Sequence, residues 1–136
     1  MTKSLLAIFA VTALTGSSLF GQDELRVTIP FDFNAGQHAL AAGDYTVRMS
    51  YAAGTIQVRT ADARHAVQLL AHAASPSRGS DTARLVFHKY GDRYFLSQVF
   101  QSGNNPGQEL PRSHEEQEQI AARHAVKTIT IAAMVR

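Results

Sequence analysis

Histidine is the residue type in this chain with the widest capacity for metal binding or acid–base chemistry, and six are present. Compact zinc motifs place histidines as H-x-H or H-E-x-x-H, and neither spacing occurs. The closest two are seven residues apart, so a regular strand would point them to opposite faces. We therefore predict no metal site and ordinary surface or edge positions for His38, His65, His72, His88, His114 and His124.

Catalytic signatures are equally sparse. The chain has no cysteine nucleophile, no G-x-S-x-G elbow, no P-loop and no G-x-G-x-x-G motif. A secreted hydrolase would draw on residues such as Asp32, His88 and Glu116, but nothing in their spacing brings them together. The sequence thus predicts a protein that is not an enzyme and takes no cofactor, with the hydrolase kept as the third alternative.

Charge and composition narrow the class of partner. Thirteen basic residues stand against eleven acidic ones, which gives a formal charge of +2 with the basic residues scattered. Phosphate backbones need clustered Lys and Arg, so we expect no nucleic acid partner. A hydrophobic content of 45% with 18% charged residues fits a folded domain. The absence of cysteine excludes a disulfide scaffold and thiolate metal sites.

The amino-terminal segment has the pattern of a secretory signal peptide. Lys3 precedes an apolar run over residues 5–14, which falls short of the roughly 20 residues needed to span a bilayer. Small residues allow cleavage after Ser18 or after Gly21. We predict a signal peptide over residues 1–21 and a single β-domain over residues 22–136, without a transmembrane segment in the mature chain. The protein is then exported, to the periplasm or outside the cell.

In much of the rest of the chain, apolar residues alternate with polar ones. This period of two is typical of strands that are buried on one face. Such stretches are separated by short turns and cover residues 25–33, 45–50, 55–60, 64–72, 84–90, 93–100 and 126–135. The pattern predicts an all-β fold, a small antiparallel sandwich or barrel of about seven strands. One short helix near the C-terminus is expected from Ser113, where Glu116 completes a capping box.

Gly91 and Asp92 join two of these stretches as a two-residue hairpin turn, which places His88 opposite Phe95 and Phe87 opposite Leu96. One face of the hairpin is assigned to the core, namely Leu85, Phe87, Tyr94, Leu96 and Phe100. The other face is also rather apolar, so the helix, a partner or a ligand must cover it. We predict a binding surface on that second face, formed by His88, Tyr90, Arg93 and Phe95.

Aromatic residues on the inward faces offer a second possibility. In a closed barrel, Phe31, Phe33, Tyr45 and Phe87 would line a cavity for a small apolar ligand. Alternatively these rings, with Tyr94 and Phe100, fill the core of a domain that lacks Trp. The sequence favours a filled core.

Three blocks of sequence resemble a family of small exported proteins common in acidobacteria. They are Ile29–Phe33 with Leu40–Val47, then Leu85–Val99, then Glu109–Ser113. The chain departs from that family where Ala41 replaces the usual Pro, and Val126–Arg136 matches least well. The family is uncharacterised, so the resemblance implies export and a shared fold but assigns no activity.

Together these observations predict an exported, non-catalytic β-domain with an envelope-associated or binding role. The alternative is a small β-barrel that carries an apolar ligand. The expected partner is accordingly either a protein or a small apolar molecule, and the oligomeric state stays open.

Overall fold

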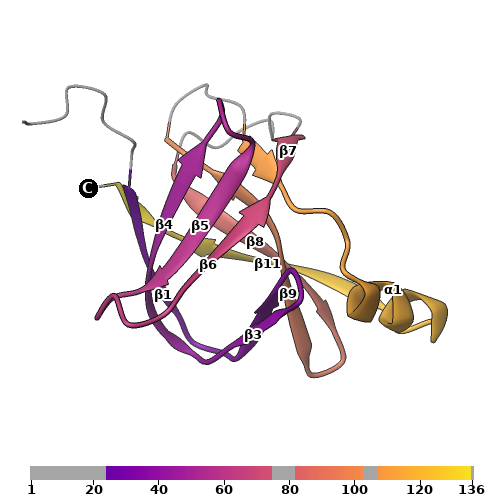
Figure 1. Cartoon of the computed structure of the whole chain (residues 1–136). Helices are drawn as coiled ribbons and strands as arrows, with labels where there is room; N and C mark the ends of the chain where they lie inside the picture. The colour runs from indigo at the N-terminus through magenta and orange to yellow at the C-terminus, as the bar shows by residue number, and fades with distance from the viewer. Residues whose placement is uncertain (1–23, 75–81, 103–106, 136) are drawn as a thin grey trace, which may run out of the picture.

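The computed structural model describes residues 24–74, 82–102 and 107–135. The predicted signal peptide and its two cleavage sites lie outside these residues. Within them the chain forms two β-sheets that pack face to face and one short helix, α1 (His114–Ala121). Figure 1 shows β4, β5 and β6 lying across β8 and β11, with α1 at one side of the sheets. This confirms the predicted all-β, sandwich-like fold.

Sheet A is antiparallel, with strand order β12-β1-β4-β5-β6. Its strands are β1 (Glu24–Ile29), β4 (Gly43–Ser50), β5 (Thr55–Thr60), β6 (Ala66–Leu70) and β12 (Met134–Val135).

Sheet B has the order β11-β8-β9-β10-β7, and β2 joins β9 through a single parallel bridge. Its strands are β2 (Phe33–Ala35), β3 (His38–Leu40), β7 (His72–Ala74), β8 (Arg84–Tyr90), β9 (Arg93–Phe100), β10 (Gly107–Glu109) and β11 (Val126–Ala132).

The two sheets are linked at their edges by strands that continue from one sheet into the other. β6 passes through Ala71 into β7, and β11 passes through Ala133 into β12. Such sheet-switching strands form the corners of a closely packed sandwich. The seven stretches predicted from alternation correspond to the seven long strands. The five strands of two or three residues were not predicted as separate strands, because a period of two needs at least four residues to be recognised.

Alternation along the long strands produces the core between the sheets. In β1 the side chains of Leu25, Val27 and Ile29 are buried, whereas Arg26 and Thr28 are exposed. The same pattern buries Val47 and Met49 in β4 and their cross-strand partners in β5. We call the side of the β8–β9 hairpin that packs on sheet A its inner face, and the opposite side its outer face.

The inner face of this hairpin differs from the predicted one because β9 contains a β-bulge. The pairs His88–Phe95 and Phe87–Leu96 are confirmed, but the register shifts beyond them so that Val86 pairs with Gln98. The extra residue in β9 reverses the side chains that follow. Val99 therefore belongs to the core between the sheets, and Phe100 packs with Val86 and Ala74 on the outer face. The assignment of Phe100 to the inner face was wrong for this reason.

Helix α1 begins and ends at defined caps. The Ser113 hydroxyl accepts a hydrogen bond from the Glu116 amide at 3.2 Å, as the capping box predicts. At the other end, the amide of Arg123 donates to the Ile120 carbonyl and that of His124 to Gln119, a Schellman arrangement. Arg123 has φ 61°, the left-handed conformation that this motif requires. No helix among the described residues is long and apolar enough to cross a bilayer.

Candidate binding surface

The four residues of the predicted binding surface lie together at the turn end of the β8–β9 hairpin. Tyr90 and Phe95 are buried at 3% and 2% exposure, and their rings meet edge to face with centroids 5.8 Å apart. His88 is partly buried and Arg93 is exposed, with its guanidinium 5.3 Å from the centre of the Phe95 ring. The structure therefore brings all four together.

Helix α1 covers this part of the outer face. The Glu116 carboxylate is 3.2 Å from His88 Nδ1, and it accepts a hydrogen bond of 3.1 Å from the Tyr90 hydroxyl. At the rim, the Arg93 guanidinium donates to the Glu115 carboxylate. Of the three covers considered for this face, the helix is the one that the structure provides.

Glu116 takes part both in the cap of α1 and in the contact of α1 with the sheet, and the sequence predicted only the cap. Its backbone amide is capped by Ser113, while its side chain, only 5% exposed, turns toward the sheet. A buried carboxylate is tolerated where hydrogen bonds satisfy it, and His88 and Tyr90 provide such partners. Burial, followed by the charge of Glu116, raises the pKa of Tyr90 above its ordinary value. Three of the predicted surface residues, His88, Tyr90 and Arg93, thus hold α1 in place.

The aromatic residues proposed as a cavity lining pack on one another. Phe33 meets Tyr45 and Phe87 edge to face, with centroids 5.3 and 5.5 Å apart. Phe31 meets Phe87 at 5.0 Å and stacks on Tyr94 at 3.8 Å. At these separations the rings are in contact with one another. This favours the interpretation that they fill the core over the interpretation that they line a ligand cavity.

The three residues considered for a hydrolase are placed in two different settings. His88 and Glu116 meet in the pair described above, beneath α1. Asp32 is exposed before β2, where its carboxylate accepts a hydrogen bond of 2.9 Å from the Ala42 amide. Asp32 therefore braces a connection at the β2–β3 end of the sheet, apart from the hydrogen bonds that join His88 and Glu116.

Several of the six histidines pair with glutamates. His72 Nε2 is 3.6 Å from Glu109, and His114 Nε2 is 3.0 Å from Glu118 one turn along α1. Within residues 24–74, 82–102 and 107–135, no three side chains of the metal-binding types gather in a group.

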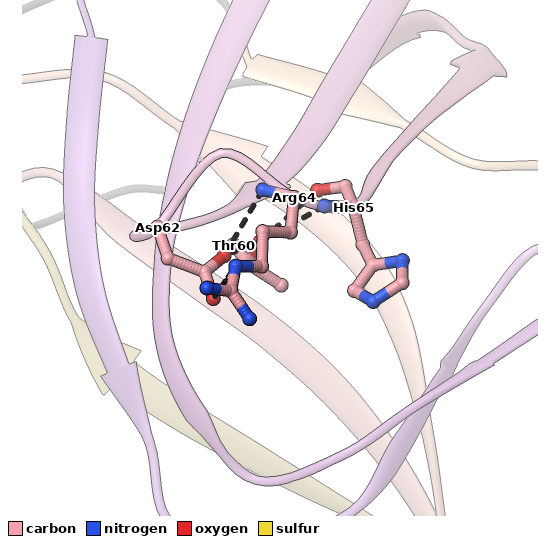
Figure 2. Close-up of polar contacts among 4 residues, drawn as sticks. All are labelled: Thr60, Asp62, Arg64 and His65. Atoms are coloured by element: carbon pink, nitrogen blue, oxygen red, sulfur yellow. Dashed lines mark hydrogen bonds and ion pairs between the residues drawn. The ribbon is translucent and has the colours of Figure 1, made fainter.

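A cluster of polar contacts outside α1 occupies the turn between β5 and β6, drawn in Figure 2. The Thr60 hydroxyl donates to the Asp62 carboxylate at 2.6 Å, and the Arg64 amide donates to it at 3.0 Å. These bonds, the Thr60 hydroxyl first, lower the pKa of Asp62. The His65 amide in turn donates to the Thr60 hydroxyl. Because its bonds close locally, we interpret this cluster as a structural turn.

A feature that the sequence analysis missed is the open edge of sheet B. Strand β11 ends the order of the sheet, pairs with β8 over all seven of its residues, and has no described strand on its other side. It is longer than the other strands that end a sheet path, which have two to five residues. Lys127 is its only charged residue. Its β-branched composition was visible in the sequence, but its place at an edge was not.

Comparison of the chain with protein-family models, with curated proteins and with solved structures finds no match.

Proposed function

We propose that this chain is an exported, non-catalytic β-domain that binds an extended segment of a partner protein along the open edge of β11. The observation that carries the proposal is the edge itself, seven residues long and rich in Val, Ile and Thr. An edge strand presents a row of unused main-chain donors and acceptors, to which an extended segment can add as a further strand.

The exposure of β11 supports this proposal. Val126 is 54% exposed, and Thr128 and Thr130 are exposed on the same side of the strand. On the other side, Ile129 and Ile131 are half-buried against the core and anchor the strand. A partner strand would therefore meet a fixed template instead of ordering a loose one, which lowers the entropic cost of binding.

Helix α1 keeps the beginning of this template in position. Only residues 122–125 separate α1 from β11. The predicted surface residues His88, Tyr90, Arg93 and Phe95 would then contribute to binding indirectly, because they fix α1 and through it the start of the edge strand.

Export is tested first, by amino-terminal sequencing of the protein recovered from its own host. A mature chain beginning after Ser18 or Gly21 in the periplasm or medium is expected. A cytoplasmic chain that keeps Met1 and residues 1–21 would overturn the proposed location.

Edge binding is tested by amide hydrogen exchange of the exported protein with and without envelope extract from the host. We expect slower exchange in β11, and loss of this protection in the double variant Thr128→Lys/Thr130→Lys, because charged side chains discourage strand addition. The matched control is Gln57→Lys on β5, which has paired neighbours on both sides. Protection that appears elsewhere, or that survives in the double variant, contradicts edge binding.

A further inference from the structure

A small basic pocket lies where the β8–β9 turn meets the beginning of β11. Its volume is about 290 Å³, and it is lined by Lys89, Gly91, His124, Ala125 and Lys127. The lining residues thus include two lysines and a histidine, and no acidic residue. Phosphate and carboxylate oxygens are the groups that such a lining would attract.

The two lysines are placed against each other by the register of the sheet. Lys127 on β11 is the direct cross-strand partner of Lys89 on β8. Like charges in this relation repel and destabilise a sheet. Among the described residues, neither lysine has an ion-pair partner, and Lys89 instead lies over the Tyr94 ring at 5.2 Å. The repulsion is therefore uncompensated within this part of the protein.

Two backbone features position the residues around the pocket. Gly91, with φ 59°, forms the tight turn of the β8–β9 hairpin. His124 is positioned by the Schellman hydrogen bonds that end α1. The nearest acidic residue in sequence, Asp92, lines a different groove together with Arg93 and Tyr94. A ligand would thus enter a pocket that has two lysines and a histidine in its lining.

We propose that this pocket binds an oxyanion, a phosphate or carboxylate group, whose charge relieves the repulsion between Lys89 and Lys127. The pocket shares Lys127 with β11, but its proposed ligand is an oxyanion and not a strand, so the inference goes beyond the proposed function. It is tested with phosphate and not with envelope extract, so its failure is distinguishable from a failure of edge binding.

The test is an NMR titration of the mature protein with sodium phosphate at constant ionic strength. Saturating shifts are expected at the amides of Gly91, Ala125 and Lys127. In Lys127→Gln the affinity should fall about tenfold, as expected for one charge-assisted hydrogen bond. Arg26→Gln is the matched control, because it removes one exposed positive charge from the outer side of sheet A. Shifts that are linear, that chloride reproduces, or that Lys127→Gln retains would overturn the proposal.

Thermal stability gives a second test. A purely structural role of the two lysines would not make the melting temperature depend on phosphate. Lys127→Gln removes the like-charge pair, so its melting temperature should exceed that of the wild type at low salt. Phosphate should raise the melting temperature of the wild type and reduce this difference. If Lys127→Gln instead lowers the melting temperature, the pair is not strained and the proposal fails.

Three further titrations distinguish the source of the oxyanion. Acetate tests a carboxylate, and vesicles of phosphatidylglycerol, with phosphatidylcholine vesicles as the control, test a lipid phosphate. Binding of phosphate without binding of phosphatidylglycerol vesicles assigns the site to a free ligand, whereas binding of both, lost in Lys127→Gln, assigns it to a headgroup. Failure of all the anions to bind would overturn the site.

Discussion

The two faces of the β8–β9 hairpin are covered in different ways. The inner face packs apolar side chains such as Leu85 and Phe87 against sheet A, and both are fully buried. At the turn end of the outer face, a helix of eight residues is attached largely through polar contacts of Glu115 and Glu116. Apolar burial depends on area and tolerates small shifts, whereas hydrogen bonds depend on individual atoms. We therefore expect the inner face to respond to side-chain volume and the outer face to protonation and single polar groups.

The largest effect is expected from a deletion on the inner face. Phe87→Ala removes a ring that contacts Phe31 and Phe33, and should lower the free energy of unfolding by about 3–5 kcal/mol. Urea denaturation followed by circular dichroism measures it. Leu70→Ala, at a side chain 75% exposed, is the control and should change stability by less than about 0.5 kcal/mol. Equal losses in the two variants would contradict the assignment of the core.

A smaller loss is expected when the polar cover of the outer face is broken. Glu116→Ala leaves the Tyr90 hydroxyl and the His88 ring without their partner on α1, which should cost about 1–3 kcal/mol. Amide exchange should accelerate in α1 while the core strands stay protected, because the helix can detach alone.

Glu118→Ala is the matched control for this change. Glu118 pairs with His114 within α1 at the surface, so its removal should cost less than about 0.5 kcal/mol. If Glu118→Ala loosens α1 as much as Glu116→Ala does, helix propensity and not the contact with the sheet holds the helix.

High pH should weaken the core and the outer face, because each contains a buried tyrosine. Burial raises the pKa of Tyr45 and of Tyr90 above the ordinary value of 10.0, with Asp32 and Glu116 adding repulsion. Well below pH 10.0 neither tyrosine makes stability depend on pH, since both are protonated in the folded and unfolded states. Above it the unfolded chain loses these protons first, so stability falls as the pH rises toward the folded pKa values.

Phenolate absorbance during alkaline titration measures these two groups. Tyr90→Phe should remove the late-titrating component that belongs to the outer face, and Tyr45→Phe the one that belongs to the core. A stability that stays constant above pH 10 in the wild type would contradict the raised pKa values.

The smallest effect is expected in the turn between β5 and β6, which belongs to neither face. Ala63 has φ 60°, a conformation that costs a residue with a Cβ about 1–2 kcal/mol. Because glycine loses about 0.5–1 kcal/mol more entropy on folding, Ala63→Gly should stabilise the protein by about 0.5 kcal/mol. Ala61→Gly, in the same turn without a positive φ, should destabilise it, and thermal unfolding of the two variants tests the difference.

Much of the fold could be predicted because the strands are long enough to show their period. The alternation in β1 and β4, the turn at Gly91–Asp92 and the cap at Ser113 all act within a few residues. The bulge in β9 could not be predicted, since it depends on how β8 and β9 pair over their whole length. One inserted residue was enough to exchange the faces of Val99 and Phe100.

The grouping of the candidate-site residues was predicted, whereas their contact with α1 was not. His88, Tyr90, Arg93 and Phe95 share one face of the hairpin, and α1 lies over it. The sequence left three alternatives for the cover of this face. The position of Glu116 in a capping box did not show that its carboxylate would be buried against His88 and Tyr90. The basic pocket could not be predicted from the sequence, because Lys89 and Lys127 are 38 positions apart and become neighbours only through the register of β8 and β11.

Local sequence was enough to predict the seven long strands, their turns, the beginning of the helix and the apolar side of the strands without a bulge, because these follow from the conformational preferences and hydrophobicity of neighbouring residues. Which strand became an edge, which face α1 covered and which charges came together were set by tertiary packing. Those outcomes depend on contacts between residues far apart in the chain, whose free energies exist only once the two sheets have packed.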